Sequence, residues 1–353
     1  MKQTKTASKA LILWLAAVCM LIFVMVAVGG VTRLTHSGLS MVDWRPLLGW
    51  LPPLTDSVWQ ATFARYQQFP EYQQVNLGMS LEGFKSIYYW EYAHRLLGRL
   101  IGLAYALPLV YFWVKGQVTG VLRSKLIVAL ILGALQGLMG WYMVQSGLVN
   151  VPSVSHYRLA AHLLLALLIM GFLFWVMLGL LMQNTSAKPS CGSTNRHGLL
   201  AHLSLGLTVL LVLQITYGAF TAGLHAGWGY NSFPDMNGQL LPDAALQFFP
   251  VWRNFFENPV MVQFIHRVLG TLALVFGLVL LARALTDSVD RRLITGMCLL
   301  ATCMLLQYLL GVYVLLNAVP LVAAVLHQAM ACVVLLLSLW VMHRCFWFGH
   351  QCH

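Results

Sequence analysis

Eight apolar segments dominate this sequence and restrict what it can fold into. They lie near residues 11–29, 89–113, 125–147, 158–182, 199–224, 260–285, 293–316 and 320–343. Each approaches or exceeds the roughly 20 residues that a helix needs to cross a bilayer. Only 9% of the residues are charged, against about 25% in a typical soluble domain. The sequence therefore predicts an all-α integral membrane protein with eight transmembrane helices.

The first apolar segment follows Lys2, Lys5 and Lys9, as the core of a signal peptide would. Its apolar run is longer than the roughly 7–15 residues of such a core, and no good A-x-A cleavage site follows. We therefore predict a retained helix.

Charge predicts the orientation of the helices. Most lysines and arginines outside the apolar segments fall on the side that holds both chain ends, so the positive-inside rule places both termini in the cytoplasm. The net charge of +11 does not indicate nucleic-acid binding, because the sequence contains no basic stripe or recognition motif. The long outer connections, near 30–88 and 225–259, are rich in Pro, Gly, Trp and Tyr and predict short interfacial helices.

The second half of the chain repeats the first. Four stretches recur in the same order: "GGVTRLTHSG" (29–38) and "GAFTAGLHAG" (218–227), "EYAHRLLG" (91–98) and "QFIHRVLG" (263–270), "LQGLMGWYMV" (135–144) and "LQYLLGVYVL" (306–315), "RLAAHL" (158–163) and "AAVLHQ" (323–328). A parallel repeat of four helices predicts two tandem, pseudo-symmetric four-helix bundles. The polar connection 183–198 divides them into an N-terminal bundle, 1–182, and a C-terminal bundle, 199–353.

Four histidines stand at matched depth in this repeat. His94, His162, His266 and His327 each lie one or two turns inside a helix that enters from the outer side. A single such histidine more often makes an interhelical hydrogen bond. Two imidazoles on facing helices, however, can supply both axial ligands of a haem iron. A zinc or copper site would need a compact cluster of three or more ligands, which the spacing does not provide.

Neighbouring residues refine this hypothesis. Arg158 precedes His162 by four residues, on the same helix face, where it would meet a haem propionate. For this reason we favour His162 over His156 as the ligand. Gly98 and Gly270 lie one turn deeper than the histidines that precede them and would let a flat macrocycle approach, although helix packing is an equal alternative. For His36 and His225, which end the first helix of each half, we expect loop roles.

The two copies differ at one position that bears on chemistry. Glu91 lies three residues before His94 and shares its helix face, whereas the second copy has Gln263 there. A carboxylate can accept a proton or stabilise a developing cation, and an amide cannot. The sequence therefore predicts one reactive bundle, with Glu91 as the catalytic residue, and one electron-carrying bundle. The alternative is that Glu91 merely pairs with an arginine.

Three motifs resemble the haem A synthase family, the Cox15/CtaA proteins of cytochrome oxidase assembly. They are "GGVTRLTHSGLSMVDWRPLLGWLPP" (29–53), "YYWEYAHRLLGRLIG" (88–102) and "YRLAAHL" (157–163). The resemblance covers nearly the whole chain. Some members of the family have a cysteine pair in the first outer loop. No cysteine lies between Cys19 and Cys191, so this chain resembles the subtype without the pair.

The resemblance implies an oxidoreductase that converts haem O to haem A. It would oxidise one porphyrin methyl to a formyl group through a hydroxymethyl stage, with water as the oxygen source. It also implies that His94, His162 and Glu91 form the substrate site and that His266 and His327 hold a haem b. A bacterial cytoplasmic (inner) membrane, haem sites toward the outer face, a haem O synthase as neighbour, and a quinone or redox protein as electron acceptor would follow. A homo-oligomer is compatible with the sequence.

A second function stays open from the residues alone. A non-catalytic di-haem b-type cytochrome that exchanges electrons with quinone would have the same histidine pairs. The Glu91/Gln263 difference and the outer-loop motif favour the enzyme. A transporter would need paired broken helices, and a prenyltransferase would need aspartate-rich motifs that are missing from this sequence.

Overall fold

The computed structural model describes residues 8–43, 49–149, 151–184, 194–287 and 289–351, and these residues form helices and connections without a β-strand. Within these residues, eight helices are long and apolar enough to cross a membrane, which confirms the eight predicted spans. They are α1 (Lys9–Leu34), α4 (Leu81–Val114), α5 (Gly120–Gln145), α6 (His156–Asn184), α7 (Thr194–Gly223), α9 (Pro259–Thr286), α10 (Arg291–Leu316) and α11 (Leu321–Gln351).

Short helices occupy the two long connections, as the sequence predicted. The first connection contains α2 (Asp56–Tyr66) and α3 (Pro70–Gln74). The second contains η1 (Ala226–Trp228), η2 (Asp243–Leu246), η3 (Val251–Arg253) and α8 (Asn254–Glu257). The side chain of Thr55 caps α2 by accepting a hydrogen bond from the Val58 amide, and Ser80 caps α4 in the same way through Gly83.

The chain forms two compact units. The N-terminal unit is Ala16–Met170, and the C-terminal unit consists of the described residues of Met1–Leu15 and Gly171–His353. The predicted division at 183–198 falls largely on residues outside the described ones. The tandem arrangement of two bundles, 1–182 and 199–353, stays a prediction.

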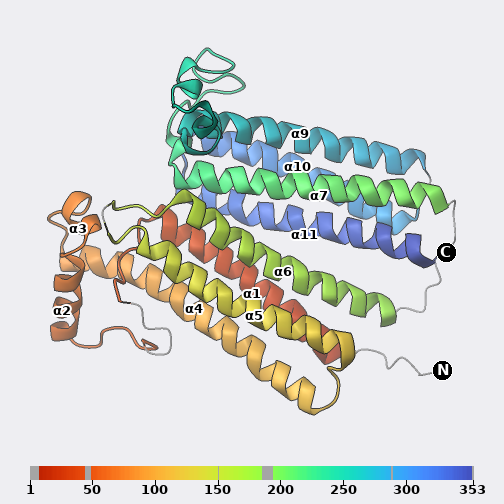
Figure 1. Ribbon diagram of the computed structural model, residues 1–353, viewed down its shortest axis with the longest axis horizontal. Coiled ribbons are helices and arrows are strands. Elements are labelled where there is room, and N and C mark those ends of the chain that lie inside the picture. Colours follow the sequence, from red (N-terminus) through yellow and green to blue (C-terminus); the bar gives the residue numbers. More distant parts are fainter. Residues whose placement is uncertain (1–7, 44–48, 150, 185–193, 288, 352–353) are drawn as a thin grey trace. The chain divides into compact units, whose positions relative to one another are not determined.

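Four helices of the C-terminal unit close into a ring. Helix α7 packs against α9 and α11, and α10 packs against the same two helices; Figure 1 shows the four running side by side. Small residues such as Ala273, Ala284 and Gly277 are buried between the helices. Lipid offers no hydrophobic driving force between helices, so close packing through small residues supplies the attraction.

The N-terminal unit has an aromatic cluster at the start of α4. Trp59 and Tyr66 of α2 pack against Phe84 and Tyr88 of α4, and Figure 1 shows α2 and α3 at this end of the helix. The rings of Tyr66 and Phe84 have centroids 5.0 Å apart. Further along, the Tyr105 hydroxyl donates to the Leu126 carbonyl at 2.7 Å and joins α4 to α5.

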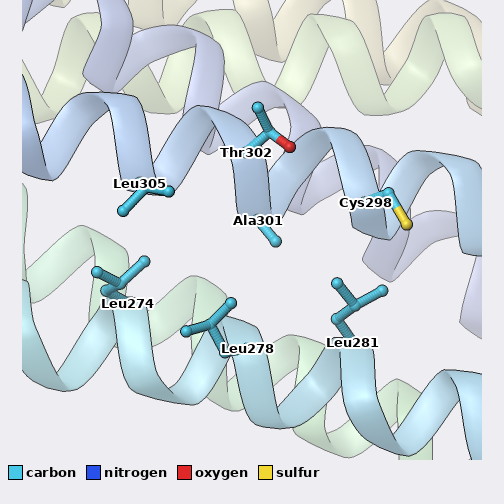
Figure 2. A pocket seen from close by; sticks show the side chains of 7 residues that line it. All are labelled: Leu274, Leu278, Leu281, Cys298, Ala301, Thr302 and Leu305. Atoms are coloured by element: carbon cyan, nitrogen blue, oxygen red, sulfur yellow. The ribbon is translucent and has the colours of Figure 1, made fainter.

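An apolar groove lies between α9 and α10. Figure 2 shows the side chains that line it: Leu274, Leu278, Leu281, Cys298, Ala301, Thr302 and Leu305. None of the four matched histidines is among them, so this groove is separate from the site described next.

Candidate functional site

The structure brings together the two histidines predicted for each half. His94 of α4 and His162 of α6 lie within electrostatic range of each other, and so do His266 of α9 and His327 of α11. All four are partly buried. Among the described residues, no group of three or more His, Cys, Asp or Glu side chains could hold a metal ion. The arrangement therefore consists of two separate imidazole pairs.

Each of these rings lies against a glycine of another helix. A Cβ added to Gly29 would lie 3.1 Å from Nε2 of His94, and one added to Gly218 would lie 3.1 Å from Cε1 of His266. Real Cβ atoms rarely approach another atom so closely. A side chain at either position would therefore push the imidazole away, and the absence of one lets the ring lie beside the neighbouring backbone.

The other histidine of each pair has the same environment. A Cβ added to Gly140 of α5 would lie 3.0 Å from Cε1 of His162, and one added to Gly311 of α10 would lie 2.8 Å from Cε1 of His327. Gly140 aligns with Gly311 in the repeat, as Gly29 aligns with Gly218. The matched positions of these four glycines are visible in the repeat, but their contacts with the histidine rings are not.

Gly98 and Gly270 make room for side chains in the structure. A Cβ at Gly98 would lie 3.3 Å from Cε of Met25, and one at Gly270 would lie 3.0 Å from Nε2 of Gln214. Met25 and Gln214 occupy matching positions in the first helix of each half. These contacts correspond to the helix-packing alternative for the two glycines.

A duplicated glutamine supports the second histidine of each pair. Nε2 of Gln136 donates to the carbonyl oxygen of His162 at 3.0 Å, and Nε2 of Gln307 donates to that of His327 at 3.0 Å. Gln136 also lies 3.2 Å from Nδ1 of His162. The role of these glutamines could not be inferred from the sequence, because the hydrogen-bond partner of an amide inside a long apolar segment depends on how the helices pack.

The C-terminal pair contains buried nitrogens without a partner in the described part of the chain. Nδ1 of His266 and Nδ1 of His327 are both buried and make no hydrogen bond there. A buried polar atom without a partner costs about 1–3 kcal/mol. Imidazole nitrogen is a good ligand for iron, so two such groups, one on α9 and one on α11, are of a type that would hold a haem iron.

Glu91 is buried beneath the first connection, where it accepts three hydrogen bonds. Its carboxylate accepts from the Ser40 hydroxyl at 2.8 Å, from the Met41 amide at 2.6 Å and from the Arg95 guanidinium at 2.5 Å. Arg95 also donates to the carbonyls of Met41 and Asp43. Glu91 and Arg95 thus fasten the connection after α1 to the helix that carries His94.

Gln263 has the corresponding position with the opposite hydrogen-bond polarity. Its amide donates to the carbonyls of Ala226 at 2.8 Å and Gly229 at 2.7 Å, and its oxygen accepts from Arg267 at 3.1 Å. The second connection presents acceptors where the first presents donors. A glutamine at position 91 would therefore not reproduce the network of the second half, because its NH₂ group would face donors.

The remaining predicted residues have contacts within the protein. Arg158 donates to the Tyr142 carbonyl at 2.7 Å, and its guanidinium lies 3.7 Å from the centroid of the Tyr142 ring. The ring of His156 packs beside that of Tyr157, with centroids 4.0 Å apart. His36 and His225 both have left-handed backbones, with φ of 51° and 55°, where α1 and α7 end. The propionate role of Arg158 stays a prediction.

Comparison with known proteins identifies the family. The model of the COX15-CtaA family, described as cytochrome oxidase assembly protein, matches residues 12–339. A "Heme A synthase" of Nitrosospira multiformis is 47% identical over 97% of this chain and 95% of its own length. Proteins of the same name from Nitrosomonas eutropha and Rhodospirillum centenum are 45% and 43% identical, over 94% and 97% of this chain and 92% and 90% of their own lengths. With its length matched almost completely, the chain belongs to the COX15-CtaA family of cytochrome oxidase assembly proteins.

Proposed function

We propose that this chain is a haem A synthase, an oxidoreductase that converts a methyl group of haem O to the formyl group of haem A through a hydroxymethyl stage. The relatives that carry this name support the proposal. The observation that carries it is the duplicated histidine pair with an acidic residue beside only one copy. In the N-terminal half Glu91 lies one turn from His94, and in the C-terminal half Gln263 takes its place.

In this proposal the N-terminal half, 1–182, binds haem O as the substrate. His94 and His162 would bind its iron, with Gly29 and Gly140 giving their rings room and Gln136 holding the backbone of His162. Arg158 would reach a propionate only after turning from the Tyr142 carbonyl. This pair therefore sets the position of the methyl group relative to Glu91.

The C-terminal half, 199–353, would hold a haem b. His266 and His327, each with a buried Nδ1 that makes no hydrogen bond in the described residues, would ligate its iron. A haem bound there supplies a reversible one-electron redox centre. Gly218 and Gly311 would give the two imidazoles room, and Gln307 would hold the backbone of His327, as proposed for their counterparts in the first half.

The reaction removes electrons and protons in two equal steps. Methyl and water give hydroxymethyl with two protons and two electrons, and hydroxymethyl gives formyl with two more of each. The electrons would pass to a quinone or a redox protein. The side chain of Glu91 accepts hydrogen bonds on both oxygens, so its orientation is fixed before the reaction. It would therefore act by its position and charge, without first exchanging hydrogen-bond partners. Such a charge stabilises the positive charge that develops on the reacting carbon.

We also propose a bacterial inner membrane as the location, with both termini cytoplasmic and both histidine pairs near the outer face. Support comes from the positions of the histidines. His162, His266 and His327 lie within about two turns of the helix ends that follow the predicted outer connections. Delivery of haem O by its synthase and assembly into a homo-oligomer are compatible with this placement.

Haem extraction from the expressed protein tests the function. The wild type, produced together with haem O, should yield haem A or its hydroxymethyl precursor on chromatography. We expect Glu91→Gln to reduce product formation by about 10²–10³-fold, the usual cost of losing one preorganised electrostatic group. Glu82→Gln, at an exposed position of the same helix, is the control. Haem b alone in both halves would support the cytochrome alternative.

A further inference from the structure

The last part of the second outer connection, from residue 246 to residue 258, has a row of apolar side chains outside and two asparagines inside. Its apolar surface consists of Leu246, Phe248, Phe249, Val251, Trp252, Phe255 and Phe256. Phe249 is 85% exposed and Trp252 is 58% exposed, while Asn254 and Asn258 are 0% and 2% exposed. A segment in water would show the reverse distribution.

The buried asparagines satisfy the main chain of this connection. Asn254 accepts from the Phe248 amide at 2.9 Å and donates to the carbonyls of Phe248 at 2.8 Å and Val251 at 2.9 Å. Asn258 donates to the Ala244 carbonyl at 2.7 Å. These bonds give partners on the inner side to the amide of Phe248 and to the carbonyls of Phe248, Val251 and Ala244, which therefore need no hydrogen bonds from water.

The apolar surface also has no net charge. Arg253 and Glu257 are the charged residues between 244 and 258. They form an ion pair with an N–O distance of 2.5 Å. Internal partners for several backbone groups and paired charges lower the cost of contact with lipid, where unsatisfied polar groups are costly.

The neighbouring helix places the segment at the depth of the headgroups. Helix α9 has 28 residues, which gives a length of about 42 Å. A bilayer is about 30 Å thick in its hydrocarbon core and about 40–45 Å with its headgroups. Phe256 precedes Pro259, the first residue of α9, by three residues, so it lies within about 10 Å of the helix start.

The exposed face of α9 leads toward this region. Leu272, Val275 and Val279 are each more than half exposed, as expected for residues that face lipid. Phe and Trp side chains just beyond such a face match the aromatic belts of membrane proteins. Lipid that covers α9 would therefore also reach the segment before it.

We propose that the apolar surface is inserted into the headgroup boundary of the bilayer and binds phospholipid. This contact anchors the second connection at a fixed height. The connection in turn is tied to α9, because Gln263 and Arg267 bind the carbonyls of Ala226, Gly229 and Tyr230. Lipid contact would thus steady the end of the helix that carries His266, whatever reaction the protein performs.

Site-specific photocrosslinking tests the proposal in intact membranes. A p-benzoylphenylalanine in place of Phe249 should give phospholipid adducts by mass spectrometry. The same group in place of Gln239, an exposed polar residue of the same connection, should give none. Crosslinks from position 249 to protein, whether to another part of this chain or to a partner, would overturn the proposal, and so would equal lipid adducts at both positions.

A second measurement does not depend on the photoreactive residue. Tryptophan fluorescence is recorded in nanodiscs with and without brominated lipid, for the wild type and for Trp252→Phe. If Trp252 lies at the boundary, the variant should lose a quenchable part of the emission. An unchanged quenched fraction would rule the contact out.

Discussion

Replacing Gly311 by alanine should weaken binding of the haem proposed for the C-terminal half and leave the protein folded. The new Cβ would lie 2.8 Å from Cε1 of His327, about 0.6 Å inside the 3.4 Å at which ordinary contact begins. The imidazole can turn away, because it is the end of a side chain. A displacement of this size exceeds the roughly 0.2 Å within which metal–ligand distances are held.

The expected effects on haem binding and on stability have opposite signs. Loss of support around a metal ligand typically lowers affinity by about 10–100-fold. Alanine in place of glycine inside a helix stabilises that helix by about 1 kcal/mol. The variant should therefore be expressed and remain folded while its haem b content falls. Pyridine haemochrome spectra measure the haem, and a thermal melt of the apoprotein measures the stability.

Gly137 provides the matched control. It lies in α5, where an added Cβ meets no described atom within 4 Å. Gly137→Ala should be stabilised by the same helix effect and should keep all of its haem. Gly140→Ala, three residues further along, should lose haem from the N-terminal half only. If Gly311→Ala binds haem b as fully as Gly137→Ala does, the contact between glycine and imidazole does not position the ligand, and the argument fails.

Two further predictions concern charge. Arg95→Leu should lower the stability of the N-terminal unit by about 3–5 kcal/mol, because it leaves the buried carboxylate of Glu91 without its cation. Arg267→Leu should lower stability less, because its partner Gln263 is neutral. Equal losses of stability in thermal melts would contradict this reasoning. Burial raises the pKa of Glu71 from 4.5 to about 7. The folded state therefore binds more protons than the unfolded state between these pH values, so the free energy of unfolding should fall by about 3 kcal/mol as pH rises from 4.5 to 7 and then stay constant. Glu71→Gln should remove this part of the dependence, and a pH profile of melting temperature that matches the wild type would refute the assignment.

The amino-acid sequence by itself determined the eight membrane helices and the pairing of each histidine with a counterpart in the other half. Both follow from local properties. A long apolar run forms a helix in lipid because its backbone groups must pair within the segment. The repeat gives His94 and His266 matching neighbours in the sequence, although α4 begins further before its histidine, at Leu81, than α9 does, at Pro259. The sequence also showed that Gln263 occupies the position of Glu91 in the second half, because the two copies align there without a gap.

Only the tertiary structure decided what these residues contact. The partners of Glu91, Ser40 and Met41, are about 50 residues distant in the sequence. Nothing in the sequence indicated that the second connection turns its asparagines inward. Gly29 and Gly140, more than Gly98, proved to make room for the imidazoles. The physical reason is that periodicity places a residue on a face of its own helix, whereas the atoms opposite that face depend on how the helices and connections pack.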